Sequence, residues 1–244
     1  MTTPKFTWCK EFPVEAPYVS TPRSVGADMF VPEFTIGFFD KFTSVNKFIV
    51  ENKENGILFM SPKYTERIQK LEAERDSVIE QFKQSSATIE PEKLKAEIAG
   101  IEHRYGNAIN LAKHEMCVAV FDADKNTLYV KSLCIIPSGI LIDLPEDYWF
   151  DVRRKSSSNR SGRVIQLGTV DEDYTYNIGI EIEPVGNHTA LTSGEKLAQI
   201  VFFKKVMTFA DGEETSYEKF VDRDSVHNKR QDRTGGWGST GKTK

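Results

Sequence analysis

Three acidic residues and a tyrosine stand together at 171–174, in the order Asp-Glu-Asp-Tyr. A glycine precedes them at 168, and isoleucines alternate with smaller or polar residues after them, at 178–182. This pattern is typical of a tight turn that leads into a half-buried strand. A carboxylate held at such a turn can orient a water molecule, and the tyrosine ring can pack against a sugar. The alternative is an acidic surface turn without a ligand.

Two other stretches have the composition of a nucleotide-binding surface. Residues 153–162 read Arg-Arg-Lys-Ser-Ser-Ser-Asn-Arg-Ser-Gly, and cations, hydroxyls and loop amides together suit a phosphate group. Residues 232–241 contain four glycines, hydroxyl residues and Trp237, which suits a segment that closes over a ligand and stacks on a base. The alternatives are a solvated basic loop and a disordered tail.

Two single polar residues stand in or beside apolar stretches. Asp28 follows a glycine and precedes a short apolar stretch, where an aspartate is most often a turn former. Gln199 interrupts the apolar stretch 196–206. Since a buried amide needs hydrogen-bond partners, we interpret Gln199 either as a member of a polar network or as an edge position.

The elements expected to position these residues are mostly short strands. Prolines in the first 23 residues exclude a helix there, and the Phe, Ile, Val and Thr content of 34–50 favours a strand. Further strands, separated by turns about every ten residues, are predicted at 116–121, 127–132, 140–144, 148–152 and 196–206. This arrangement predicts a mainly β fold, an all-β barrel or jelly roll.

Residues 62–84 and 91–114 differ from the rest because their apolar residues recur every three or four positions. That spacing predicts two helices, and Pro91 suits the first position of the second helix. A short break joins them, so we expect an antiparallel helical hairpin. We divide the chain into a barrel made of 1–58 and 116–210, a helical hairpin inserted at 59–115, and a C-terminal arm at 211–244.

Composition limits the possible partners and the location. The 244 residues carry a net charge of −4, which argues against a general nucleic-acid coat. Three widely spaced cysteines suggest reduced thiols. No signal peptide and no apolar stretch long enough to cross a bilayer are visible. We therefore expect no membrane and no nucleic-acid partner, and a cytoplasmic location, which for a phage- or virus-encoded protein is the host cytoplasm.

Five stretches resemble, in order, the five motifs of the trimeric dUTPase family. They are Gly26-Ala27-Asp28-Met29, Arg154-Lys155-Ser156-Ser157, the stretch from Gly168 to Tyr174, the stretch from Gly194 to Val201, and the stretch from Gly235 to Gly241. The resemblance covers about 1–50 and 116–244. The helical hairpin is left without a counterpart.

The resemblance implies a jelly-roll β-barrel homotrimer whose active sites are shared between subunits. It also implies Mg²⁺-assisted hydrolysis of dUTP to the monophosphate and pyrophosphate, through attack of water on the α-phosphorus. Asp171 would orient that water, Ser156 would donate to an oxygen at the α–β linkage, and Asp28 would hold a magnesium-bound water. The substrate-binding residues that the resemblance implies are Lys155, Ser157, Gln166, Tyr174, Gly179, Gln199, Arg233, Trp237, Ser239 and Thr240.

Three departures from the family pattern bear on the choice of base. Lys155 replaces the usual arginine, Tyr176 stands where a glycine is expected, and Trp237 replaces the commoner phenylalanine in a motif one residue short after Arg233. A side-chain amide can rotate and serve either uracil or cytosine. Gln166 and Asn177 carry such amides near the turn at 171–174, so dCTP is our second candidate substrate.

Two other functions remain open. The stretch Lys155-Ser156-Ser157-Ser158-Asn159-Arg160 is similar to one in dCTP deaminases, and Glu181 falls where they carry the glutamate that activates water. A dCTP deaminase, or a bifunctional deaminase–dUTPase, is therefore the alternative enzyme. A nucleotide-gated binding module, with the helical hairpin as a docking arm, is the non-enzymatic alternative. Released ammonia or pyrophosphate distinguishes the two enzymes.

Overall fold

The computed structural model describes residues 6–21, 24–85, 89–155 and 162–204. The chain divides into two compact units, Met1–Asn46 with Asn126–Lys244 and Lys47–Lys125. No described helix is long and apolar enough to cross a membrane.

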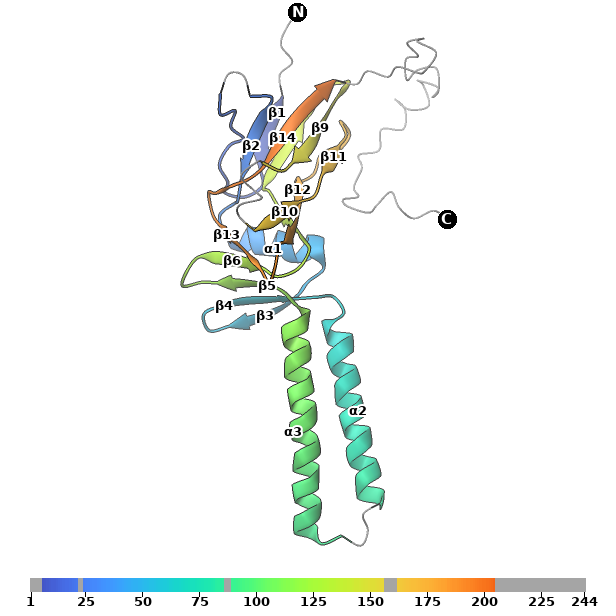
Figure 1. The fold of residues 1–244 in the computed structure, drawn as a ribbon. Helices are drawn as coiled ribbons and strands as arrows, with labels where there is room; N and C mark the ends of the chain where they lie inside the picture. Colours follow the sequence, from blue (N-terminus) through green and yellow to red (C-terminus); the bar gives the residue numbers. More distant parts are fainter. Residues whose placement is uncertain (1–5, 22–23, 86–88, 156–161, 205–244) are drawn as a thin grey trace, which may run out of the picture. The chain divides into compact units, whose positions relative to one another are not determined.

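The first unit is built from short antiparallel strands (Figure 1). In chain order they are β1 (Thr7–Lys10), β2 (Gly26–Phe30), β6 (Thr127–Val130), β7 (Cys134–Pro137), β8 (Ile140–Asp143), β9 (Tyr148–Arg153), β10 (Arg163–Ile165), β11 (Gly168–Val170), β12 (Gly179–Pro184), β13 (Thr189–Thr192) and β14 (Lys196–Lys204). The mainly β prediction is confirmed, and the predicted strands at 127–132, 140–144 and 148–152 lie within two residues of β6, β8 and β9.

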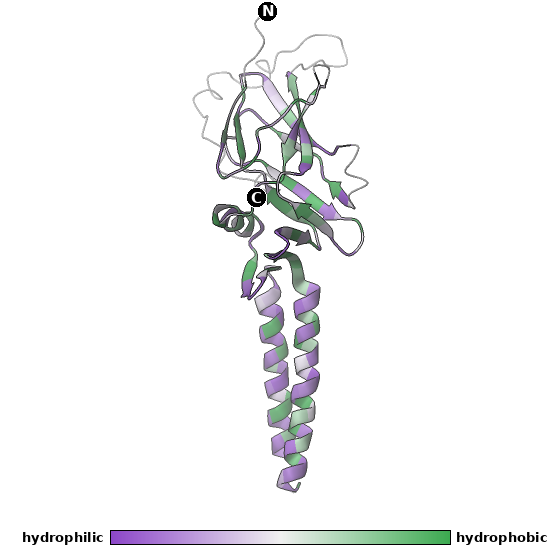
Figure 2. Cartoon of the chain, turned by 90° about the vertical axis from the view of Figure 1, so that its left-hand side faces the viewer, coloured by the Kyte–Doolittle hydropathy of each residue, from purple (hydrophilic) through white to green (hydrophobic). Residues whose placement is uncertain are grey.

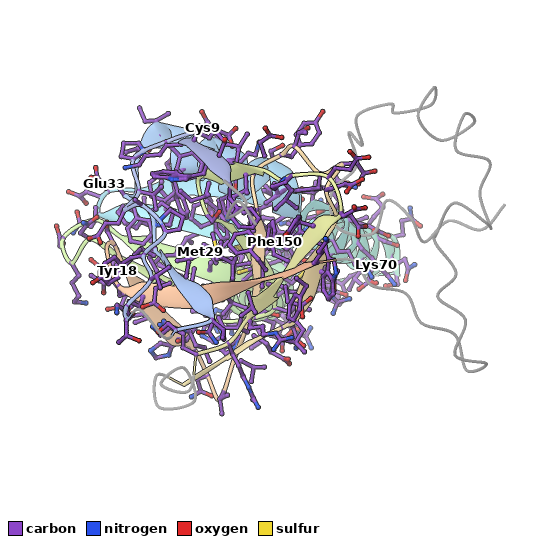
Figure 3. The ribbon with its side chains drawn as sticks, turned by 90° about the horizontal axis from the view of Figure 1, so that it is seen from above. Cys9, Tyr18, Met29, Glu33, Lys70 and Phe150 are labelled. Carbon is purple, nitrogen blue, oxygen red and sulfur yellow. The ribbon has the colours of Figure 1, made fainter. Side chains whose placement is uncertain are left out.

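The largest sheet lying wholly within this unit has four strands in the order β11-β9-β14-β2. A second sheet has the order β10-β12-β7, and β1 pairs with β8. Successive side chains of a strand point to opposite faces, so one face of the four-stranded sheet is apolar and buried. Met29 and Phe150, labelled in Figure 3, are both 1% exposed on that face. Asp28 and Gln199 belong to the opposite face, because they are the alternate residues of the same strands.

Residues 34–50 do not form the predicted strand. They contain helix α1 (Ile36–Asn46), and β3 (Ile49–Lys53) begins three residues later. Phe38 and Phe42 are four residues apart, and both are fully buried on one face of the helix. The prediction was wrong because it relied on strand-favouring composition and overlooked this four-residue spacing.

Side chains at both ends fix the length of α1. Thr35 Oγ1 accepts a hydrogen bond from the backbone N–H of Phe38 (3.3 Å), as an N-cap does. At the other end Asn46 donates to the carbonyl of Phe42 (2.8 Å) and also bonds the backbone N–H and C=O of Ile135 (2.8 Å each). Lys47 then adopts a left-handed conformation with φ 57°, which ends the helix.

The second unit combines three strands with two long helices. The strand β4 (Gly56–Met60) pairs on one side with β3 and on the other with β5 (Cys117–Asp122). Gly56 lies so close to β5 that an added Cβ would be 2.0 Å from the carbonyl oxygen of Phe121. Only glycine fits at this position.

The two helices are α2 (Tyr64–Ser85) and α3 (Pro91–Met116), within two residues of the predicted ranges. They pack against each other, and Leu71, Ile101 and Ala112 are their buried residues. Their ribbons are coloured largely as hydrophilic in Figure 2, with separate hydrophobic segments. Most residues of the apolar stripe of each helix are half-buried.

Candidate active site

Asp28 is the most buried carboxylate among the predicted site residues. It lies on β2, is 3% exposed, and exchanges two backbone hydrogen bonds with Tyr18 (2.7 and 3.0 Å). Its carboxylate accepts from Ser20 Oγ (2.8 Å), from Lys196 Nζ (2.8 Å) and from Lys155 Nζ. A buried charge of this kind is stable only when it is paired and hydrogen-bonded, and both oxygens of Asp28 meet that requirement.

Asp28, Lys155 and Lys196 form a cluster, called the Asp28 cluster, whose charge state is determined by its ion pairs. Burial alone would raise the pKa of Asp28, but hydrogen bonds from Lys155, Lys196 and Ser20 outweigh it and lower the pKa to about 2. The hydrogen bond to Asp28 in turn raises the pKa of Lys196. At neutral pH one carboxylate thus faces two ammonium groups. The cluster has a net positive charge and suits a phosphate.

Gln199 joins this cluster through the sheet. It is directly opposite Asp28 on β2 and opposite Arg153 on β9, and its Nε2 donates to the carbonyl of Arg154 at 3.5 Å. Since β14 has a neighbour on each side, the edge-position interpretation of Gln199 is wrong. The amide has a backbone partner in the Arg154 carbonyl. Asp28, Lys155 and Gln199 therefore come together, as the sequence predicted for one site.

Lys196 was not among the predicted site residues. It is three residues before Gln199, and regular alternation would place the two side chains on opposite faces of the sheet. The register between β14 and β2 shifts between Lys196 and Ala198, as at a β-bulge, so Lys196 is opposite Phe30. The bulge turns Lys196 to the face of Asp28, which no alternation pattern in the sequence indicates.

A buried arginine holds the chain where Lys196 begins. Arg163 is 4% exposed and donates to Glu195 Oε1 (2.6 Å), to the Ala190 carbonyl (3.3 Å) and to the Lys196 carbonyl (3.5 Å). These bonds tie β10 to the turn that precedes β14. They help to fix the backbone from which Lys196 reaches Asp28.

Asp171 and Tyr174 form a second group, directly after β11. The backbone N–H of Tyr174 donates to the carbonyl of Asp171 (3.1 Å), and its hydroxyl donates to the carbonyl of Asn177 (2.8 Å). Burial, with smaller contributions from the Glu11 carboxylate and from Tyr176, raises the pKa of Tyr174. The ring of Tyr174 is therefore held in place and uncharged at neutral pH, as a surface that packs on a sugar requires.

The two amides considered for base recognition are held differently. Asn177 is 6% exposed; its Oδ1 accepts from the Gly139 N–H (3.3 Å) and its Nδ2 donates to Glu11 Oε2 (2.7 Å), so it cannot turn over without losing both bonds. Gln166 donates to Glu183 Oε2 (3.2 Å) at an exposed position. Gln166 is therefore less tightly held than Asn177, by one exposed side-chain bond.

The Asp28 cluster and the turn with Asp171 and Tyr174 lie apart within one chain. Along the paired strands, Asp28 is level with Arg153 of β9, whereas Asp171 follows Val170, which is opposite Phe150. Three strand spacings and about four residues separate the two aspartates, a distance of roughly 20 Å.

Of the other predicted site residues, Gly179 is the first residue of β12, opposite Pro137. The others lie outside the described residues: Ser156, Ser157, Arg233, Trp237, Ser239 and Thr240.

The residues around Asp28 do not fit a directly coordinated metal. Mg²⁺ prefers several oxygen ligands, but here a single carboxylate has two ammonium groups as neighbours. Among the described residues, no group of three or more His, Cys, Asp or Glu side chains could hold an ion. These residues therefore offer no direct set of ligands for Mg²⁺.

Comparison with known proteins identifies the family. No family model matches the chain. Two solved structures resemble it: the dUTPase from phage phi11 of S. aureus (19% identity, 37% of this chain and 79% of that one, TM-score 0.32) and the EIAV dUTPase (24% identity, 36% and 78%, TM-score 0.31). A deoxyuridine 5′-triphosphate nucleotidohydrolase of Chlamydia muridarum is 33% identical over 111 residues, which make up 44% of this chain and 70% of that protein. On this similarity, the chain belongs to the deoxyuridine 5′-triphosphate nucleotidohydrolase (dUTPase) family.

Proposed function

We propose that the protein hydrolyses dUTP to the monophosphate and pyrophosphate, with Asp171 orienting the attacking water. The relative in Chlamydia muridarum is named for this activity. The observation that carries the proposal is the turn after β11, where a carboxylate and a fixed tyrosine ring stand three residues apart. A general base must lie within hydrogen-bond reach of the water it activates, and a braced turn would hold the Asp171 carboxylate steady for that contact.

Each group has its own task in this reaction. The ring of Tyr174 would pack on the deoxyribose and leave no room for a 2′-hydroxyl. The ammonium groups of Lys155 and Lys196 would bind phosphate oxygens, where negative charge builds as pyrophosphate leaves. Asp28 orients both ammonium groups in the absence of substrate. It is a positioning residue for them.

We also propose that the site is completed between copies of this chain, in a homotrimer. An aspartate that acts on the α-phosphorus must lie within a few ångströms of the residues that bind the same triphosphate. The separation of roughly 20 Å between Asp28 and Asp171 in one chain is too large for that. Head-to-tail contacts close into a ring when a threefold axis relates the copies, and in such a ring the turn after β11 of one copy would face the Asp28 cluster of the next.

Two segments outside the described residues complete the proposal from sequence alone: the serines that follow Lys155, and the C-terminal arm. Ser156 and Ser157 follow Lys155 directly, so a phosphate held by Lys155 would be within reach of their hydroxyls. The arm would bring further donors to the β- and γ-phosphates and an aromatic ring to the base. The residues assigned to this closing role are Arg233, Trp237, Ser239 and Thr240.

Magnesium enters this proposal only as a partner of the substrate. Because the described residues offer no cage for the ion, it would have to bind the triphosphate oxygens and keep several of its waters. Asp28 would then hold one of those waters. The family resemblance is the source of this requirement.

A panel of deoxynucleoside triphosphates with Mg²⁺, assayed for both pyrophosphate and ammonia, tests the proposed function. We expect pyrophosphate from dUTP. Pyrophosphate from dCTP would support a base pocket in which the Gln166 amide reorients. Ammonia from dCTP would instead favour a deaminase with Glu181, which is half-buried on β12 between the buried Ile180 and Ile182. No turnover of dUTP would rule out the proposed function.

A further inference from the structure

Asn177 is fixed in one orientation by two groups of opposite character. The backbone N–H of Gly139 can only donate, and it donates to Oδ1. The carboxylate of Glu11 can only accept, and it accepts from Nδ2 at 2.7 Å. If the amide turned over, its NH₂ group would face the Gly139 N–H, which is also a donor. Its oxygen would face the Glu11 carboxylate, which is also an acceptor. The bond to Glu11 is also charge-assisted, so it is stronger than one between neutral groups.

The same hydrogen bonds continue to the proposed catalytic aspartate. The carbonyl of Asn177 accepts from the hydroxyl of Tyr174 (2.8 Å), and the N–H of Tyr174 donates to the carbonyl of Asp171 (3.1 Å). A displacement of Asn177 would therefore reach Tyr174 and Asp171 through two short steps.

Glu11 is itself held from two sides. Its backbone N–H donates to the Gly139 carbonyl (2.8 Å), and its second carboxylate oxygen accepts from Lys41 Nζ on α1 (2.9 Å). Gly139 has φ +75°, and a Cβ there would lie 2.7 Å from the ring of Phe12. The segment around Glu11 and the turn at Gly139 thus pack too closely for any side chain at 139, and the Glu11 backbone is hydrogen-bonded to that turn.

We propose that Glu11 is a positioning residue for the turn after β11 that carries Asp171 and Tyr174. Glu11 acts through Asn177 and does not touch the substrate. The inference rests on the proposed function, because it assigns to Glu11 the task of holding the water-orienting carboxylate in place. It adds a residue of the N-terminal segment to an active site whose other members follow residue 150 or lie on β2.

An exchange of donor and acceptor between the two residues tests the proposal. The variant Asn177→Asp sets two carboxylates against each other, and we expect kcat for dUTP to fall roughly 10-fold or more. Adding Glu11→Gln to it restores every pair: the new glutamine can donate to position 177 and accept from Lys41, and the Gly139 N–H still has an acceptor. We expect the double variant to recover kcat to within about 3-fold of wild type.

Two further measurements separate this role from simple stability. The control Lys41→Ala removes only the outer ion pair and should leave kcat within about 3-fold of wild type. Hydrogen exchange of the Asn177 side-chain amide, followed by NMR, should be slow in wild type and roughly 10-fold or more faster in Glu11→Ala.

A folded Asn177→Asp variant with wild-type kcat, or a double variant as inactive as Asn177→Asp, would overturn the proposal. So would equal exchange of the Asn177 amide in wild type and Glu11→Ala, which also decides the matter if a variant folds too poorly for kinetics. If the wild-type protein does not hydrolyse dUTP, the proposed function fails. The exchange measurement then still shows whether Glu11 holds Asn177.

Discussion

Lys196 Nζ lies 2.8 Å from Asp28 Oδ2, although the two residues are far apart in the sequence and only a β-bulge turns the lysine to the aspartate's face. With Lys155 bound to the other oxygen, the aspartate keeps two cations together. Two ammonium groups so close would otherwise repel each other. Asp28 therefore maintains a positively charged surface before any substrate is bound.

The ionisation of Asp28 should be visible in the stability of the fold. Its pKa is about 2 in the folded protein against an ordinary 3.8, so the folded state favours the charged form. The stabilisation is fully present above pH 4 and is lost as the pH falls towards 2, by up to about 2 kcal/mol. Urea unfolding at a series of pH values would measure it. In Asp28→Asn this part of the pH dependence should be absent, and an unchanged slope would contradict the assignment.

Asp171→Asn should lower kcat for dUTP by roughly 100-fold to 10,000-fold, the range for removal of a general base. The backbone bond from the Tyr174 N–H to the Asp171 carbonyl does not involve the carboxylate, so it can persist in the variant, and the thermal midpoint checks that the fold is kept. The neighbouring substitution Glu172→Gln is the matched control. Glu172 accepts from the N–H of Asp147 at an exposed position, and a glutamine can do the same. Equal loss in both variants would remove Asp171 from the catalytic role.

Tyr174 contributes a ring and a hydroxyl, which can be tested separately. Tyr174→Phe keeps the ring and loses the hydrogen bond to Asn177, so we expect a loss of stability of about 1 kcal/mol and continued preference for dUTP over UTP. Tyr174→Leu removes the flat surface, and the ratio of kcat/KM for dUTP over UTP should fall. If the leucine variant still rejects UTP as wild type does, the ring is not what excludes the 2′-hydroxyl.

Chelation should affect turnover without affecting the free protein. The described residues hold no cluster of carboxylates that an ion would stabilise, so EDTA should leave the thermal midpoint of the substrate-free protein unchanged. It should lower the rate of dUTP hydrolysis, because the ion is expected to arrive with the triphosphate. Restoring Mg²⁺ should restore the rate. A midpoint that drops on adding EDTA would indicate a resident metal ion instead.

The sequence predicted the features that depend on local patterns, whereas its failures have both local and long-range causes. Alternation and turn residues indicated strands such as β8 and β9, and the three-or-four spacing indicated α2 and α3. Helix α1 was missed because its phenylalanines suit a strand by composition and a helix only by spacing. Lys196 was missed because a bulge reverses its face. Glu11 could not have been found, since its partner Asn177 is 166 residues away and only the folded chain brings them together.

Mixing two inactive variants would test whether the site is shared between copies. In Asp28→Asn the Asp28 cluster is damaged and the turn with Asp171 is intact, whereas in Asp171→Asn the turn is damaged and the cluster is intact. If each site takes its Asp28 cluster from one copy and its Asp171 turn from the next, a trimer assembled at random from equal amounts contains intact sites. An intact site needs an Asp171→Asn copy to supply the cluster and an Asp28→Asn copy to supply Asp171. Each is present with a chance of one half, so about one quarter of the sites should be active. Co-expression of the two variants should therefore restore roughly a quarter of wild-type turnover, although neither variant is active alone. If both groups act within a single chain, no mixture can contain an intact site and activity stays at the level of the variants. The roughly 20 Å between Asp28 and Asp171 within one chain leads us to expect recovery.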